Sequence, residues 1–141
     1  MTPLYNPLSD LTAVQNILIS DPEILSLLDL AGKPKNKIVE RIIKHNKWSD
    51  LANSDKRLCV YFIPSRRTAN NSVFEEVLEI DCHVPSSENY KAWQVQERIF
   101  ELLHKKRVNN RYLYAEPPLG ELPTMAGFFC CGSRFKFYRI I

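Results

Sequence analysis

The sequence is poor in glycine, with 4 in 141 residues, and lacks the motifs that mark nucleotide-binding and hydrolytic sites. A phosphate-binding loop needs closely spaced glycines, and neither G-x-x-x-x-G-K-[ST] nor G-x-G-x-x-G is present. The zinc-protease pattern H-E-x-x-H and the nucleophile elbow G-x-S-x-G are absent as well. We therefore expect a protein that is not an enzyme.

Long apolar runs are also missing. No run approaches the roughly 20 residues that a membrane-spanning helix needs, and the first eight residues have neither the charge nor the apolar core of a signal peptide. We expect the chain to fold in a cytoplasm. There is no C-x-x-C pair, and Cys59, Cys82 and Cys131 fall in apolar stretches, where a free thiol behaves as a small hydrophobe. All four cysteines, Cys130 included, are expected to be free thiols.

The overall composition is that of an ordinary globular domain, with 45% hydrophobic and 25% charged residues. We expect one domain over residues 1–141. The net charge of +3, from 19 basic and 16 acidic residues, is too balanced to indicate a nucleic-acid binder. Basic residues gather at 33–47, 105–111 and 134–139. We interpret them as solvated faces and helix ends, the alternative being a surface that faces DNA or an acidic partner.

The first 56 residues are expected to be mainly helical. Apolar residues recur at helical spacing over about 10–20. Asp21 and Pro22 form a helix start, a capping carboxylate followed by proline at the first helical position, and Gly32 ends that helix. A third helix is expected over about 36–46, with isoleucine and valine on one face.

Residues 57–141 predict a ββαββ order. The expected elements are strands over 58–63 and 74–84, a helix from about Ser87 to Arg107, and strands over 112–115 and 128–140. The core stripe of the helix is Ala92, Val95, Ile99, Leu102 and Leu103, widened by Trp93 and Phe100. With the N-terminal helices, this order indicates an α+β fold: a four-stranded, mainly antiparallel sheet with helices packed on one face.

The strand over 74–84 has the clearest alternation in the chain. Only Glu76 interrupts its apolar face, and its polar face carries Glu79, Asp81 and His83. These three side chains could hold a metal, as a small metal-dependent hydrolase would need. The interpretation we favour is a solvated sheet face with favourable cross-strand partners, such as Arg134 and Lys136.

A zinc site built from cysteine is the other metal hypothesis. It would have to be assembled across strands from Cys59, Cys82, His83 and Cys130 or Cys131. Recognisable zinc sites bring closely spaced ligand pairs on loops, which are absent here. We therefore expect no metal, no cofactor and no catalytic residue.

Two long irregular segments, 65–71 and 116–127, are the strongest indication of function. In a small domain, long loops usually serve binding. The alternative for the second segment is that it folds back and covers its own sheet. The residues expected to contact a partner or another subunit are Arg66, Arg67, Asn70, Asn71, Pro117, Pro118, Leu119, Leu122 and Met125.

From about residue 58 onward, the layout resembles the tail-terminator and head–tail joining (tail completion) proteins of long-tailed bacteriophages. The resemblance lies in the order and spacing of four segments. These are the strand Leu58–Phe62, the alternating strand Glu79–Pro85, the helix Tyr90–Leu103 that follows directly, and the closing strand Ser133–Tyr138.

The resemblance implies a structural virion protein at the head–tail joint, made in the host cytoplasm. Members of that family form closed homo-oligomeric rings, commonly hexamers, that cap the tail tube and dock to the capsid connector or stopper protein. DNA passes through the lumen, and no membrane or enzymatic activity is involved. The helical first part is longer than in the simplest members, so the layer of the joint that this chain occupies, and whether its nearest neighbour is the tube or the connector, stay open. The face that meets the tail tube stays open as well. The alternatives are a small intracellular adaptor domain that binds one protein partner, and the metal-dependent hydrolase.

Overall fold

The computed structural model describes residues 6–52 and 54–140, and it confirms the α+β class. The helices are α1 (Pro7–Ile19), α2 (Pro22–Leu27), α3 (Lys35–Ile38), the short 3-10 helix η1 (Ser86–Glu88) and α4 (Asn89–Leu103). The strands are β1 (Ile42–Ile43), β2 (Arg57–Arg67), β3 (Val73–Pro85), β4 (Arg107–Val108), β5 (Arg111–Tyr112), β6 (Tyr114–Ala115) and β7 (Phe128–Ile140). No helix in this part of the chain has the length and apolar character to cross a bilayer.

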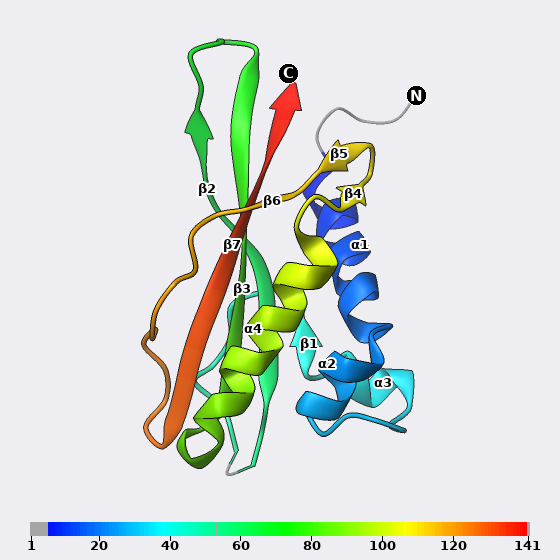
Figure 1. Cartoon of the computed structure of the whole chain (residues 1–141), viewed down its shortest axis with the longest axis vertical. Helices are drawn as coiled ribbons and strands as arrows, with labels where there is room; N and C mark the ends of the chain where they lie inside the picture. The colour runs from blue at the N-terminus through cyan, green and yellow to red at the C-terminus, as the bar shows by residue number, and fades with distance from the viewer. Residues whose placement is uncertain (1–5, 53, 141) are drawn as a thin grey trace.

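The main sheet has the order β1-β2-β3-β7-β6, and β4 and β5 form a separate small hairpin (Figure 1). The long strands β2, β3 and β7 are antiparallel neighbours, whereas β1 runs parallel to β2. The expected count of four strands is therefore wrong: the sheet described here has five, and it is mixed. The additional strand is β1, which pairs through two residues, and of the strand expected over 112–115 only Tyr114 and Ala115 join this sheet, as β6.

Strand β1 comes from the segment for which a third helix over 36–46 was expected. The helix ends at Ile38, and Ile42 and Ile43 pair with β2 instead. β-Branched side chains suit a strand that packs into a core, and Ile42 is fully buried. The side-chain amide of Gln15, on α1, donates to the carbonyl of Ile42 at 2.6 Å, so a helix holds this short strand in place.

One continuous core lies between the helices and one face of the sheet (Figure 1). Leu18 and Ile24 enter it from the N-terminal helices, and Ile80 and Phe135 enter it from the sheet. The expected stripe of α4 is buried at Ala92, Val95, Ile99 and Leu103, while Leu102 is partly buried. Trp93 and Phe100 do not widen this stripe, because they are 44% and 50% exposed.

Asp21 begins α2 as expected. Its carboxylate accepts a hydrogen bond from the backbone N–H of Ile24 at 3.0 Å, which satisfies one of the free donors of the first turn. The same carboxylate accepts two hydrogen bonds from Arg98 of α4, at 2.7 and 3.0 Å. The cap thus also joins the N-terminal helices to α4.

The β2–β3 hairpin projects past the helices at one end of the molecule (Figure 1). Its tip is shorter than the expected loop over 65–71, because residues 65–67 belong to β2. Asn70 shapes the tip: its side-chain oxygen accepts from the N–H of Ser72 at 2.9 Å, a local bond that favours a turn. Arg66 and Arg67 are therefore strand residues.

Candidate functional site

The first group of expected contact residues lies on the projecting hairpin. Arg66, Arg67, Asn70 and Asn71 are all exposed. Arg66 is already paired within its own chain, however, with Glu75 at 3.0 Å and Glu116 at 2.8 Å. Its guanidinium joins the hairpin to the start of the 116–127 segment, whereas Arg67 is the arginine better placed for a neighbour.

The 116–127 segment runs along the outer edge of β7. The N–H groups of Glu116, Leu119 and Leu122 donate to backbone carbonyls of β7 at 2.8, 3.2 and 2.8 Å. This geometry supports the alternative that the segment folds back on its own sheet. Pro117 and Pro118 are exposed, whereas the apolar side chains that were expected at an interface, Leu119, Leu122 and Met125, are half-buried.

Two different edges of the main sheet are open near the hairpin. In the described residues, no strand pairs with the outer edge of β2 from Val60 to Arg67, because β1 reaches only Leu58 and Cys59. Likewise, β6 pairs with β7 only at Phe135 and Lys136, which leaves the last residues of β7 uncovered. Exposed apolar side chains surround that end of β7: Tyr112, Tyr114, Tyr138 and Ile140.

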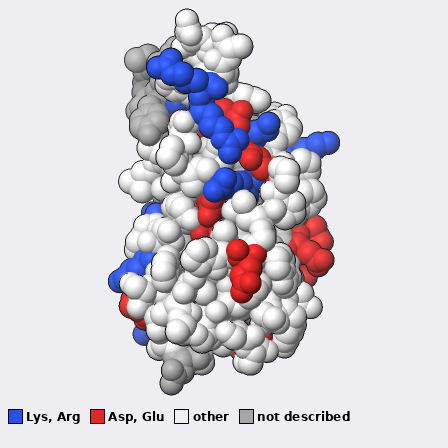
Figure 2. Space-filling model, turned by 90° about the vertical axis from the view of Figure 1, so that its left-hand side faces the viewer, with Lys and Arg blue, Asp and Glu red and all other residues white. Residues whose placement is uncertain are grey.

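Charges of both signs lie on the side of the molecule that includes the hairpin and the 116–127 segment. Figure 2 shows Lys and Arg side chains gathered over the upper half of this side, with Asp and Glu side chains among them. This mixed distribution agrees with the small net charge of +3. It is not the continuous basic surface that tight nucleic-acid binding requires.

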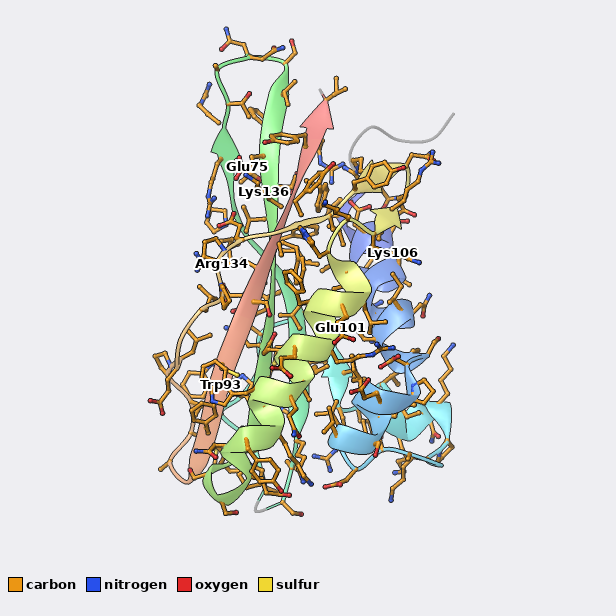
Figure 3. All side chains as sticks on the ribbon, viewed as in Figure 1. Glu75, Trp93, Glu101, Lys106, Arg134 and Lys136 are labelled. Atoms are coloured by element: carbon orange, nitrogen blue, oxygen red, sulfur yellow. The ribbon has the colours of Figure 1, made fainter. Side chains whose placement is uncertain are left out.

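A groove of about 570 Å³ lies between α4 and the segment that follows β6. Trp93, Phe100 and Pro118 give it apolar walls, and Glu97 and Glu101 add negative charge. Figure 3 shows Trp93 and Glu101 on different turns of α4. The sequence did not reveal this groove, because Trp93 and Phe100 were interpreted as core residues of the helix.

The polar face of β3 is not solvated, which corrects the interpretation from the sequence. Glu79, Asp81 and His83 are only 5%, 5% and 1% exposed. The connector between β1 and β2 and the 116–127 segment both contact this face: the ring of Trp48 stacks on His83 at 6.4 Å, and Thr124 lies 2.8 Å from its Nδ1. Neither covering segment has the regular period that would reveal its position from sequence.

Two carboxylates of this face share one tyrosine hydroxyl. The hydroxyl of Tyr61 lies 2.6 Å from Glu79 and 2.5 Å from Asp81. Burial, together with the neighbouring Glu79, raises the pKa of Asp81 to about 8. Burial also acts to raise the pKa of Glu79, but hydrogen bonds from Asp81, Tyr61 and Arg134 outweigh it and lower that pKa. The two neighbouring carboxyl groups therefore have different pKa values, and Asp81 keeps its proton to a higher pH than Glu79 does.

Arg134 is a cross-strand partner of this face, as expected, and its Nε donates to Glu79 at 2.8 Å. Lys136 lies opposite Val77 in the register of β3 and β7, so its backbone neighbour is apolar. The partly exposed Arg134 thus neutralises the buried Glu79, one of the two carboxylates.

His83 and Cys130 are direct partners in the register of β3 and β7, and His83 Nε2 lies 3.7 Å from Cys130 Sγ. Burial lowers the pKa of His83 to about 4 and raises the pKa of the Cys130 thiol. A neutral imidazole beside a thiol with a raised pKa is the opposite of an activated cysteine nucleophile. All four cysteines are free, as expected, and Cys82 and Cys131 lie on the core face instead.

Ligand atoms of Asp81, His83 and Cys130 all lie within 4.8 Å of one another. Each sequence hypothesis contained part of this cluster, but neither combined Asp81 with Cys130. The missing information was the register of β3 and β7, which places Cys130 opposite His83 and Gly132 opposite Asp81.

Comparison with known proteins adds no relative. No family model matches this sequence, and no curated protein is significantly similar to it.

Proposed function

We propose that this chain is a structural virion subunit at the head–tail joint of a long-tailed bacteriophage. It forms a ring, commonly a hexamer in the family it resembles, that caps the tail tube and docks to the capsid connector or stopper protein. DNA passes through the lumen. The observation that carries the proposal is the pair of unlike open sheet edges beside the projecting hairpin.

A closed ring of identical subunits needs two different surfaces on each subunit, because its contacts run head to tail. The outer edge of β2 and the free end of β7 are two such surfaces on one sheet. An exposed strand edge pairs readily with another chain. In the proposed ring, the β2 edge of one subunit meets the β7 end of the next, and the sheet continues between them.

The side chains at the β7 end favour burial in a contact. Tyr138 is 46% exposed and Ile140 is 69% exposed. Clustered apolar groups next to an open strand edge indicate a protein interface rather than an ordinary solvated surface. The mixed surface charge suits a lumen through which DNA passes without being held.

Light scattering on the purified full-length chain tests the ring, alone and with isolated tail tubes. We expect a mass of several subunits, about six for the hexamer that the resemblance implies. A Tyr138→Glu variant should shift the protein toward the monomer, because it places a charge at the contact. Tyr90→Glu is the matched control: Tyr90 is 54% exposed at the start of α4, far from the hairpin (Figure 1). A wild-type chain that stays monomeric even on tail tubes would exclude the ring.

A monomeric adaptor that binds one protein partner is the second candidate, and the groove beside α4 favours it. Its apolar walls and acidic residues suit an apolar segment that carries basic side chains. A monomer that binds such a partner, and loses it in a Trp93→Ala variant with Tyr138→Glu unaffected, would support the adaptor over the ring.

A further inference from the structure

The buried cluster of Asp81, His83 and Cys130 has the ligand types of a transition-metal site. Cys130 Sγ and His83 Nε2 are 3.7 Å apart. Zinc–sulfur and zinc–nitrogen bonds of about 2.3 and 2.0 Å at a tetrahedral angle place the two ligand atoms about 3.5 Å apart. The spacing of these two atoms is thus already that of a bound pair.

The carboxylate of Asp81 gives a second, independent indication of a bound ligand at this cluster. Its Oδ1 is buried and has no hydrogen-bond partner among the described residues, and a buried oxygen left unpaired costs free energy. Its other oxygen, Oδ2, is held by the Tyr61 hydroxyl at 2.5 Å. One oxygen is therefore oriented by a neighbour while the other lacks a partner, as in a carboxylate that binds a metal through one atom.

Gly132 allows that oxygen to lie directly against the backbone of β7. It lies opposite Asp81 in the register, and a Cβ built on it would be 2.3 Å from Asp81 Oδ1. Any other residue at position 132 would displace the carboxylate. The absence of a side chain on β7 at this point is thus required by the position of Asp81.

His83 is oriented as metal-binding histidines usually are. Its Nδ1 lies 2.8 Å from the hydroxyl of Thr124, and its Nε2 faces Cys130. A hydrogen bond at one ring nitrogen fixes the ring and leaves the other nitrogen as the ligand. Stacking of Trp48 on the imidazole further restricts its rotation.

We propose that Asp81 Oδ1, His83 Nε2 and Cys130 Sγ bind one divalent metal ion of the zinc class. Mixed sulfur, nitrogen and oxygen donors suit Zn²⁺ rather than Mg²⁺ or Ca²⁺, which take oxygen. Binding of the ion displaces the protons of Asp81 and Cys130 into solvent, and the resulting carboxylate and thiolate balance the charge of a divalent ion. Three protein ligands leave a fourth position for water.

The role of the ion is structural. The three side chains are at most 5% exposed, so the ion is closed off from a large substrate. It joins β3 to β7, and its neighbours Trp48 and Thr124 belong to the two segments that cover this face. The site lies at the end of the sheet away from the hairpin tip, so the inference is independent of the proposed ring contacts.

The test is a titration of the reduced, metal-free, full-length chain with Co²⁺ and then Zn²⁺. We expect one ion per chain, a thiolate-to-cobalt charge-transfer band, and displacement of Co²⁺ by Zn²⁺. Cys130→Ser should abolish the band. Cys131→Ala is the matched control, because Cys131 is the next residue, is equally buried and faces the core. It should bind the metal as the wild type does.

Thr124→Val provides a variant outside the ligand set, should Cys130→Ser fail to fold by circular dichroism. Loss of the hydroxyl that orients His83 should weaken the affinity about 10- to 100-fold. A wild-type chain that takes up neither ion would overturn the proposal. Equal binding by the wild type and Cys130→Ser, or by the wild type and Thr124→Val, would place the metal elsewhere and overturn it as well.

Discussion

The guanidinium of Arg139 lies in the core between two carboxylates, and its removal should be costly. Its Nε donates to Glu76 at 2.6 Å and its Nη2 donates to Asp10 at 3.0 Å, with all three side chains at most 5% exposed. An Arg139→Met substitution keeps much of the apolar stem and leaves Glu76 buried without this partner. Removing one member of a buried ion pair costs about 3–5 kcal/mol.

Asp10 keeps a cationic partner in the Arg139→Met variant, because it also accepts two hydrogen bonds from Arg111, both at 2.7 Å. The loss is therefore concentrated on Glu76. A double variant, Glu76→Leu with Arg139→Met, removes both buried charges and should recover most of the stability. Replacing both members of a buried pair by apolar groups is often neutral or stabilising.

Urea unfolding followed by circular dichroism measures these differences, at a protein concentration low enough to keep the chain monomeric. The single Arg139→Met change should also lower the melting temperature by roughly 10–15 °C. If the double variant is as unstable as the two single variants added together, the cost does not come from an unpaired buried charge and the reasoning fails.

Three further predictions concern other parts of the molecule. Ile99→Ala should lower the free energy of unfolding in urea by about 2–5 kcal/mol, because it truncates a fully buried side chain and leaves a cavity in the core. A loss below about half a kcal/mol would contradict the assigned core. The hydrogen bonds from Arg98 lower the pKa of Asp21 despite its burial, so the carboxylate stabilises the fold above about pH 4, and this stabilisation is lost as the pH falls through the lowered pKa. In Asp21→Asn, the free energy of unfolding should therefore fall less steeply as the pH is lowered. An unchanged pH dependence of that free energy would refute the role of Asp21. Arg67→Glu should leave the fold intact but impair assembly on tail tubes, as seen by electron microscopy, because it reverses an exposed charge at the proposed contact. Normal joining of heads to tails in a phage that carries the change would show that Arg67 does not lie at the interface.

Parts of the candidate sites were predictable because they depend on local patterns. The alternation of β3 placed Glu79, Asp81 and His83 on one face and suggested Arg134 and Lys136 as cross-strand partners. Of these two, Arg134 pairs with Glu79, whereas Lys136 lies opposite Val77. Whether this face is exposed to solvent or covered by other segments was not predictable. It depends on the segments that carry Trp48 and Thr124, whose polar and proline-rich sequences have no period to show where they pack.

Local patterns along the chain predicted the α+β class, the two long alternating strands, the core stripe of α4 and the cap at Asp21. Each depends on periodicity or on a neighbour a few residues away. Glu76 shows the limit of such patterns. It interrupts the apolar face of β3, and only the tertiary structure provides its partner Arg139, 63 residues along the chain. The same holds for β1, where pairing with β2 and a bond from Gln15 outweigh a helical pattern. The juxtaposition of Asp81 with Cys130 was likewise decided only by folding, because strand register between distant segments is set by the packing of the whole sheet against its helices.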